Sequence, residues 1–128
     1  MKRLLALEEL AQFALAIYAI TTLHTSIDTY ILVIAFFSPD LFMVGYFVSP
    51  KVGMVMYNFS HHRFTAIALI FYGLLMSHPI ILLTGLLFFA HSSFDRILGY
   101  GLKYSDSFSH THLGYIGKEK SRNPADAL

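Results

Sequence analysis

Residues 79–96 read PIILLTGLLFFAHSSFDR, an apolar run that leads into His91, Asp95 and Arg96. An apolar run of this kind is typical of a helix that crosses a lipid bilayer, whose hydrocarbon core needs about 20 apolar residues. Burying an ionisable group in lipid costs free energy. Each such group in this segment is therefore a candidate for a functional role. The segment therefore predicts a membrane helix that carries the groups of a site.

The composition of the whole chain also indicates an integral membrane protein. Of its 128 residues, 55% are hydrophobic and only 13% are charged, whereas soluble domains have about one quarter charged residues. The chain has no cysteine, so a bound metal would need imidazole, carboxylate, amide or water ligands. The formal charge is only +1, and the cationic residues gather at the two termini. This distribution excludes nucleic acid as a partner.

Four windows are long and apolar enough to form membrane helices. They cover residues 4–23, 29–48, 53–76 and 80–103. Ser38, Pro39 and Asp40 interrupt the second window. Because proline removes a backbone hydrogen bond and aspartate caps a restarted helix, the second helix is predicted to be kinked or broken near Pro39.

The positive charges predict how these windows cross the membrane. Lysine and arginine occur before the first window, between the second and third, and at the end of the fourth and beyond it, and the other two loops have none. Since such loops stay on the cytoplasmic side, both termini are expected to be cytoplasmic. The predicted fold is all-α, an antiparallel four-helix membrane bundle. Residues 1–114 would form this single domain, and residues 115–128 a polar, flexible tail. The cationic residues used here are Lys2, Arg3, Lys51, Lys103, Lys118, Lys120 and Arg122.

Four polar residues are expected at similar depths in this bundle. Asp40, His61 and Asp95 each lie about eight residues, or roughly 12 Å, from the cytoplasmic end of their helix, and His91 lies one turn deeper. Helix bundles build metal sites from imidazoles and carboxylates on facing helices. Asp40, His61, His91 and Asp95 are therefore predicted to bind a divalent metal ion, with zinc favoured and iron or manganese as the other choices.

Six further residues are candidates for supporting this site or binding a substrate. Asn58 would orient a ligand, and Arg96 or Lys103 would receive an anionic headgroup. His62 and Arg63 cannot face the same way as His61, so at least one is expected to support the site or lie at the lipid interface. His110 and His112 form a His-x-His pair, whose rings point the same way in an extended segment. We expect this segment to fold back so that His112 lies at the cytoplasmic mouth of the bundle.

These motifs carry a family resemblance. Pro39-Asp40, Gly45-Tyr46, residues 50–53, Tyr57-Asn58 with His61, His91 with Asp95-Arg96, residues 99–104 and residues 111–114 resemble the small bacterial membrane family catalogued as domain of unknown function 4260. The resemblance covers nearly the whole chain up to about Gly114 and implies a multi-pass protein of the bacterial inner membrane. The resemblance does not imply a particular reaction.

A weaker likeness is to the LexA-regulated, membrane-bound, metal-dependent hydrolases. It rests on the early Pro-Asp, on His62-Arg63, and on His91 with Asp95 and Gly99. The Thr-His-Ser that follows the His-Arg pair in those proteins is absent here. The likeness implies metal-dependent hydrolysis.

Three functions are open at this point. The first is metal-dependent hydrolysis of a membrane-soluble substrate such as a lipid ester, in which the metal activates water. The second is a proton-coupled transporter or channel component that uses the same His/Asp cluster as a relay, for which four spans would require a homo-oligomer. The third is a structural protein in which Asp40 and Asp95 neutralise Arg63 and Arg96 in buried ion pairs. Membrane lipids are the expected partners in each case.

Overall fold

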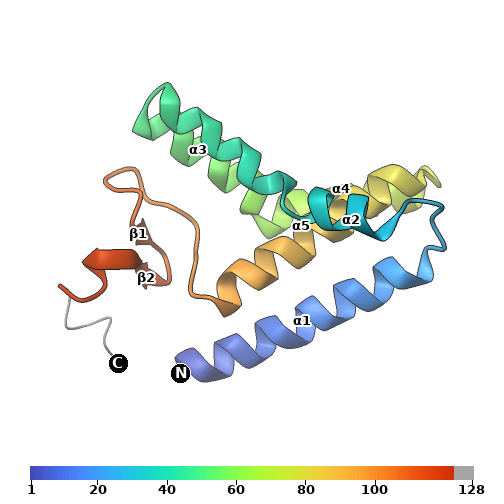
Figure 1. The fold of residues 1–128 in the computed structure, drawn as a ribbon, viewed down its shortest axis with the longest axis horizontal. Coiled ribbons are helices and arrows are strands. Elements are labelled where there is room, and N and C mark those ends of the chain that lie inside the picture. Colours follow the sequence, from blue (N-terminus) through green and yellow to red (C-terminus); the bar gives the residue numbers. More distant parts are fainter. Residues whose placement is uncertain (123–128) are drawn as a thin grey trace.

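The computed structural model describes residues 1–122, and the protein is mostly helical (Figure 1). The helices and strands follow one another along the chain, ending in a small C-terminal hairpin and a last 3-10 turn. Their bounds are α1 Lys2–Thr22, α2 Thr29–Phe36, the 3-10 helix η1 Ser38–Phe47, α3 Pro50–His61, α4 Arg63–Leu75, α5 Pro79–Ile97, β1 His110–Thr111, β2 Gly114–Tyr115 and the 3-10 helix η2 Gly117–Glu119.

Within residues 1–122, three helical segments are long and apolar enough to span a membrane. They are Lys2–Thr22, Thr29–Phe47, which joins α2 to η1, and Pro79–Ile97. Large apolar side chains such as Leu15 and Ile34 are exposed on these helices. Because water does not favour such a surface and lipid does, the segments support the prediction of a membrane protein.

The helix break predicted near Pro39 is confirmed. The α-helix α2 ends at Phe36, and η1 begins at Ser38 with Pro39 in its first turn. The Asp40 amide donates to the Phe37 carbonyl over 3.1 Å, three residues back, instead of the carbonyl four residues back. The break sets Asp40 at the start of a new helical segment.

A second break divides the third predicted window, residues 53–76, into α3 and α4. His62 adopts an extended conformation (φ −79°, ψ 127°), and its Nδ1 accepts a hydrogen bond from the Phe64 amide as the N-cap of α4. Ser92 Oγ in α5 donates to the freed His61 carbonyl over 2.9 Å. The hydrogen bonds lost at the break are therefore replaced by a local cap and by a contact with a distant helix.

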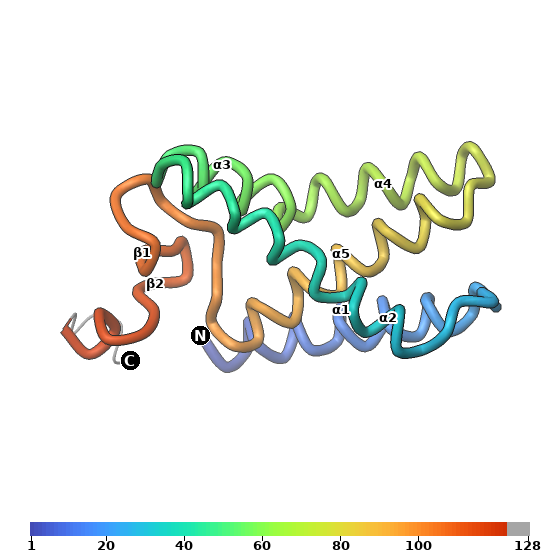
Figure 2. Tube along the Cα trace, turned by 45° about the horizontal axis from the view of Figure 1, so that its top comes forward, coloured from blue at the N-terminus to red at the C-terminus, as the bar shows by residue number. Residues whose placement is uncertain are grey.

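The helices pack in two groups that meet near the middle of the molecule (Figure 2). Helix α5 packs against both α1 and α4, and α3 packs mainly against η1. Small side chains allow these helices to approach one another closely. The buried alanines are Ala16 in α1, Ala66 in α4 and Ala90 in α5. The antiparallel hairpin pairs His110 with Tyr115 and Thr111 with Gly114.

The N-terminus and the connections between the described elements lie at two opposite ends of the molecule. The N-terminus, the turn between η1 and α3, and the β1–β2 hairpin lie at one end, and loops 23–28 and 76–78 lie at the other (Figure 1). The four-helix bundle and the side of the membrane that each end faces stay predictions. Strand β2 and η2 fall at or beyond the predicted domain boundary at residue 114, and residues 123–128 lie outside the described residues, so the division into domain and tail stays a prediction.

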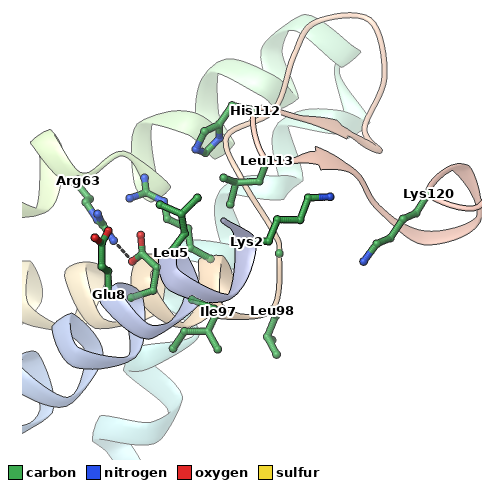
Figure 3. Close-up of a pocket in the computed structure, with 13 residues that line it drawn as sticks. Lys2, Leu5, Glu8, Arg63, Ile97, Leu98, His112, Leu113 and Lys120 are labelled. Atoms are coloured by element: carbon green, nitrogen blue, oxygen red, sulfur yellow. Dashed lines mark hydrogen bonds and ion pairs between the residues drawn. The ribbon is translucent and has the colours of Figure 1, made fainter. Parts of the chain in front are cut away.

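A cavity of about 480 Å³ lies at the end of the molecule that carries the N-terminus (Figure 3). Arg63 and Glu9 at its edge form an ion pair between α4 and α1. The Arg63 guanidinium also lies 5.6 Å from the centroid of the Phe89 ring and 3.4 Å from Ser93 Oγ. Side chains on this lining include Lys2, Glu8, Glu9, Arg63, Arg96, His112 and Lys120.

This ion pair should stabilise the packing of α1. Glu9→Gln leaves the partly buried Arg63 guanidinium without its counter-charge, which we expect to cost about 1–3 kcal/mol. Glu8→Gln removes the same charge from an exposed neighbouring position and is the control. Thermal unfolding in detergent, followed by circular dichroism, should show a lower midpoint for Glu9→Gln only. Equal midpoints for the two variants would contradict a stabilising pair.

Candidate metal centre

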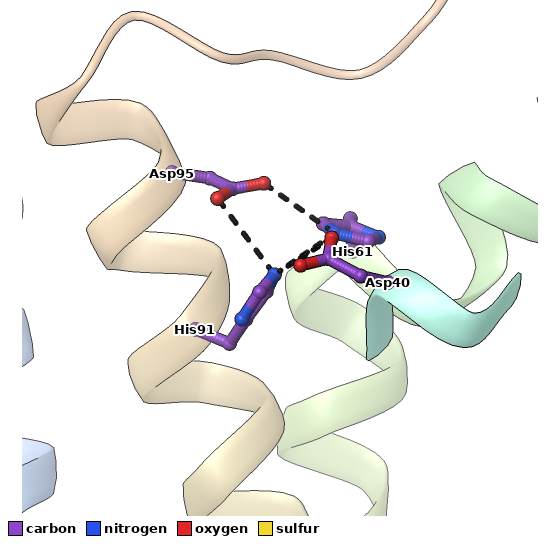
Figure 4. A group of neighbouring side chains, drawn as sticks. All are labelled: Asp40, His61, His91 and Asp95. Carbon is purple, nitrogen blue, oxygen red and sulfur yellow. Dashed lines mark hydrogen bonds and ion pairs between the residues drawn. The ribbon is translucent and has the colours of Figure 1, made fainter. Parts of the chain in front are cut away.

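The four predicted ligand residues come together between η1, α3 and α5 (Figure 4). Asp40 comes from the first turn of η1, His61 is the last residue of α3, and His91 and Asp95 lie one turn apart on α5. One possible ligand atom from each residue lies within 4.8 Å of the others. The convergence predicted from helix depths is therefore confirmed.

The distances between these atoms fit the size of a small metal site. His61 Nε2 lies 3.3 Å from Asp40 Oδ1 and 3.4 Å from Asp95 Oδ2. His91 Nε2 lies 3.3 Å from the same Asp40 oxygen, 3.7 Å from Asp95 Oδ1 and 3.1 Å from His61 Nε2. Zinc with tetrahedral bonds of about 2.0–2.1 Å holds its nitrogen and oxygen ligands about 3.3 Å apart. The group could hold such an ion with small adjustments.

Contacts behind His61 fix which of its nitrogens faces the cluster. His61 Nδ1 lies 2.9 Å from the Tyr57 carbonyl oxygen, which only accepts hydrogen bonds, so a hydrogen on Nδ1 makes this contact favourable. Nε2 then presents a lone pair to the other three residues. The Tyr57 ring also stacks on the His61 ring at 3.8 Å between centroids. An imidazole anchored to a carbonyl in this way is typical of metal ligands.

His91 is enclosed by aromatic rings. It is only 1% exposed, and the rings of Phe36 and Phe37 lie 5.2 and 6.1 Å from its ring centroid. Its Nδ1 is buried without a hydrogen-bond partner among the described residues. The polar contacts of this ring are therefore on the Nε2 side, toward the cluster.

The two carboxylates are partnered by histidines, and neither pairs with an arginine within residues 1–122. Arg63 pairs with Glu9 instead, and Arg96 forms no ion pair there. The arginine pairing considered from the sequence, Asp40 and Asp95 with Arg63 and Arg96, is thus wrong for the described part of the chain. With neutral imidazoles the group has a charge of −2, which matches one divalent cation.

Several residues that the sequence did not single out support the cluster. The Tyr57 hydroxyl donates to Asp95 Oδ2 over 3.1 Å. Ser60 Oγ lies 3.1 Å from the Pro39 carbonyl, next to Asp40, and 2.8 Å from His61 Nδ1. Tyr57 lies four residues before His61, on the same helix face. This spacing in the sequence could have identified Tyr57 as a neighbour of the site. Ser60 gave no comparable signal, because its contact with the Pro39 carbonyl joins two separate segments.

Asn58 has a different role from the predicted one of orienting a ligand. Its side chain holds the backbone of Lys103: Oδ1 accepts from the Lys103 amide over 2.7 Å, and Nδ2 donates to the Lys103 carbonyl over 2.9 Å. This pair of bonds ties the segment after α5 to α3. Asn58 thereby positions the chain that covers the cluster.

Two glycines let the segment turn after α5. Gly99 ends the helix with φ +88°, a left-handed conformation that side chains disfavour. At Gly101 a Cβ atom would lie 2.6 Å from His112 Nδ1, so only glycine fits this contact. His112 Nδ1 accepts a hydrogen bond from the Leu102 amide over 2.8 Å, and burial lowers its pKa. His112 therefore braces the segment, outside the four-residue cluster.

The remaining candidates lie outside the cluster as well. His62 is exposed and caps α4, and Arg63 is engaged with Glu9. Arg96 lines the cavity of about 480 Å³. Lys103 lines a different cavity, of about 190 Å³, together with Asp40 and Asp95. Of the six supporting candidates, Lys103 is the one that lines a cavity together with both cluster carboxylates, whereas Arg96 lines a smaller void with His61 and Asp95.

Comparison with known families identifies the family of this chain. The model of the family described as domain of unknown function (DUF4260) matches residues 2–116, so the chain belongs to that family. No curated protein and no solved structure matches the chain.

The Asn58 contacts should order the segment after α5. Asn58→Leu removes two hydrogen bonds of about 0.5–1.5 kcal/mol each, so amide exchange in residues 99–104 should be about tenfold faster or more. Hydrogen–deuterium exchange with mass spectrometry measures this rate. Ser105→Ala, at an exposed position of the neighbouring chain, is the control and should leave the rate unchanged. Unchanged exchange in Asn58→Leu would show that the segment is held by other contacts.

Proposed function

We propose that this DUF4260 member is a multi-pass protein of the bacterial inner membrane that binds one divalent metal ion through Asp40, His61, His91 and Asp95. The observation that carries the proposal is the convergence of four acceptor atoms, two imidazole nitrogens and two carboxylate oxygens, from three separate segments. Zinc is the favoured ion because it suits a small site of mixed nitrogen and oxygen ligands, and iron or manganese is the alternative.

The proposed arrangement in the membrane follows the distribution of positive charge. α1, α2 with η1, α3 with α4, and α5 would form four antiparallel crossings of a four-helix bundle. The end of the molecule with the N-terminus and the β1–β2 hairpin would be cytoplasmic, because its lysines and arginines favour that side. The metal site would then lie within reach of the cytoplasmic surface.

The proposed reaction is hydrolysis of a membrane-soluble ester. A divalent ion held by these four residues would have to take a water as a fifth ligand, and that water would be deprotonated near neutral pH. Hydrolysis joins the oxygen of this water to the carbon or phosphorus of the ester and breaks the bond to the leaving oxygen, which takes up a proton. Asp40, whose side chain is 40% exposed, is the ligand residue most open to an incoming water and substrate.

One observation favours a second candidate, a proton-coupled transporter or channel component. The Nε2 atoms of His61 and His91 lie 3.1 Å apart, each near carboxylates that could exchange a proton with it. Such a chain of groups is how membrane proteins pass protons. A pathway through so few helices would require a homo-oligomer.

Metal content tests the proposed site. The wild-type protein purified without chelator should contain about one zinc, iron or manganese ion per chain by mass spectrometry. His91→Ala should lose most of it, since removing even a supporting partner of a ligand typically costs about 10–100-fold in affinity. His78→Asn is the matched control, because His78 caps α5 at the opposite end of the molecule and asparagine keeps an acceptor there. A wild-type protein without stoichiometric metal would refute the site.

Activity separates the candidate functions. A metal-dependent hydrolase should cleave a fatty-acid nitrophenyl ester in mixed micelles, lose this activity with chelator, and regain it with zinc. A transporter should instead show proton flux in proteoliposomes that falls in the double variant Asp40→Asn, Asp95→Asn. A structural protein would show neither activity, and the same double variant would only lower its thermal stability.

A further inference from the structure

Lys103 is a buried lysine whose charge is not paired. The residue is only 4% exposed, and its ammonium forms no hydrogen bond or ion pair with any residue in the described part of the chain. Its neighbours are aromatic: the Nζ atom lies 3.9 Å from the centroid of the Phe108 ring and 5.1 Å from that of Tyr57. Burying a lysine without a counter-charge is costly, so its position needs an explanation.

The backbone holds Lys103 in place on both sides. Asn58 binds its amide and its carbonyl, and Lys103 forms an isolated antiparallel bridge with Thr111 of β1. Burial lowers the pKa of Lys103, and the Asp95 carboxylate raises it. The backbone of Lys103 is thus fixed beside the cluster, and its ammonium forms no direct ion pair with Asp95.

The ammonium and the cluster share one cavity. The cavity measures about 190 Å³, and both carboxylates, Tyr57 and Lys103 line it on its polar side. Met43 and Phe108 contribute apolar walls. Because pockets for whole ligands typically measure about 300–1,000 Å³, this cavity has room only for the head of a larger substrate.

The charges around the cavity indicate the charge that this head of the substrate would carry. The two carboxylates contribute −2 and the proposed divalent ion +2, so the site itself is neutral and the ammonium of Lys103 leaves the cavity with +1. We propose that Lys103 binds a phosphate-type oxyanion of the substrate in the cavity beside the metal. The inference rests on the proposed metal site, and it narrows the substrate from esters in general to phosphate esters.

Several features favour Lys103 as the residue that would bind this phosphate. Lysine binds phosphate as a point charge, and charge-assisted hydrogen bonds are strong when little water is present. The Tyr57 hydroxyl is already engaged with Asp95, and Lys103 is the cationic donor that lines this cavity. Arg96, the other candidate for an anionic headgroup, lines the cavity of about 480 Å³ and, beside His61 and Asp95, a void too small to hold a water. Lys103 is therefore the better placed of the two.

Binding of inorganic phosphate tests the proposal. We expect isothermal titration calorimetry of the metal-loaded protein in detergent to detect phosphate binding that is at least tenfold weaker in Lys103→Met. Lys118→Met removes an exposed ammonium from η2 and should bind as the wild type does. Metal content is measured on every sample. Equal affinity in the wild type and Lys103→Met at equal metal content would overturn the proposal.

A second measurement keeps the proposal testable if Lys103→Met does not fold. In the wild-type protein, saturating phosphate should slow acetylation of Lys103 by acetic anhydride at least tenfold, with Lys118 as the internal reference in the same mass spectra. Equal labelling of Lys103 with and without phosphate would refute the anion site. Stoichiometric metal in that same sample would leave the proposed metal centre standing, so the two failures are distinguishable.

Competition then separates the sources of the phosphate. If the substrate is a lipid, phosphatidate in nanodiscs should displace inorganic phosphate and protect Lys103. If it is a soluble ester, glycerol 3-phosphate should do so and phosphatidate should not. Either result supports the anion site, whereas protection by neither compound would count against a substrate phosphate.

Discussion

Two serine hydroxyls hold the broken backbone around the cluster. Ser60 Oγ contacts the Pro39 carbonyl, and Ser92 Oγ donates to the His61 carbonyl. Both carbonyls lie at or beside a position where regular α-helix stops, and an unsatisfied carbonyl in a membrane would cost several kcal/mol. Each hydroxyl therefore makes a helix break tolerable. Each also ties a ligand residue to a neighbouring segment, so the geometry of the site depends on these contacts.

The breaks explain why a site exists at this place. A continuous helix presents its polar side chains along one face, with backbone groups bonded internally. Asp40 at the start of η1 and His61 at the end of α3 are instead carried on helix termini, which point at α5 from one side. His91 and Asp95 complete the group from a regular helix. Two helix breaks facing one continuous helix let four side chains approach one another.

The segment after α5 adds a wall to the cavity beside the cluster. Gly99 and Gly101 let the chain turn and pack closely, Asn58 fixes its backbone, and Lys103 brings the positive charge. The acidic half of the cavity therefore comes from the helices and the basic half from the C-terminal segment. This division accounts for both proposals: a cation held by the helices, and an anion held between that cation and Lys103.

The sequence by itself determined the membrane character, the break at Pro39 and the four residues that meet. These follow from local properties: the length of apolar runs, the missing amide of proline and the constant rise of a helix, which sets His61 and Asp95 at one depth. The tertiary structure alone decided the break at His62, the choice of Glu9 as partner of Arg63, and the contact between Asn58 and Lys103. Each of these depends on a polar group finding a partner more than 25 residues away in the chain. Such choices depend on how helices pack against one another, and no local pattern of residues encodes them.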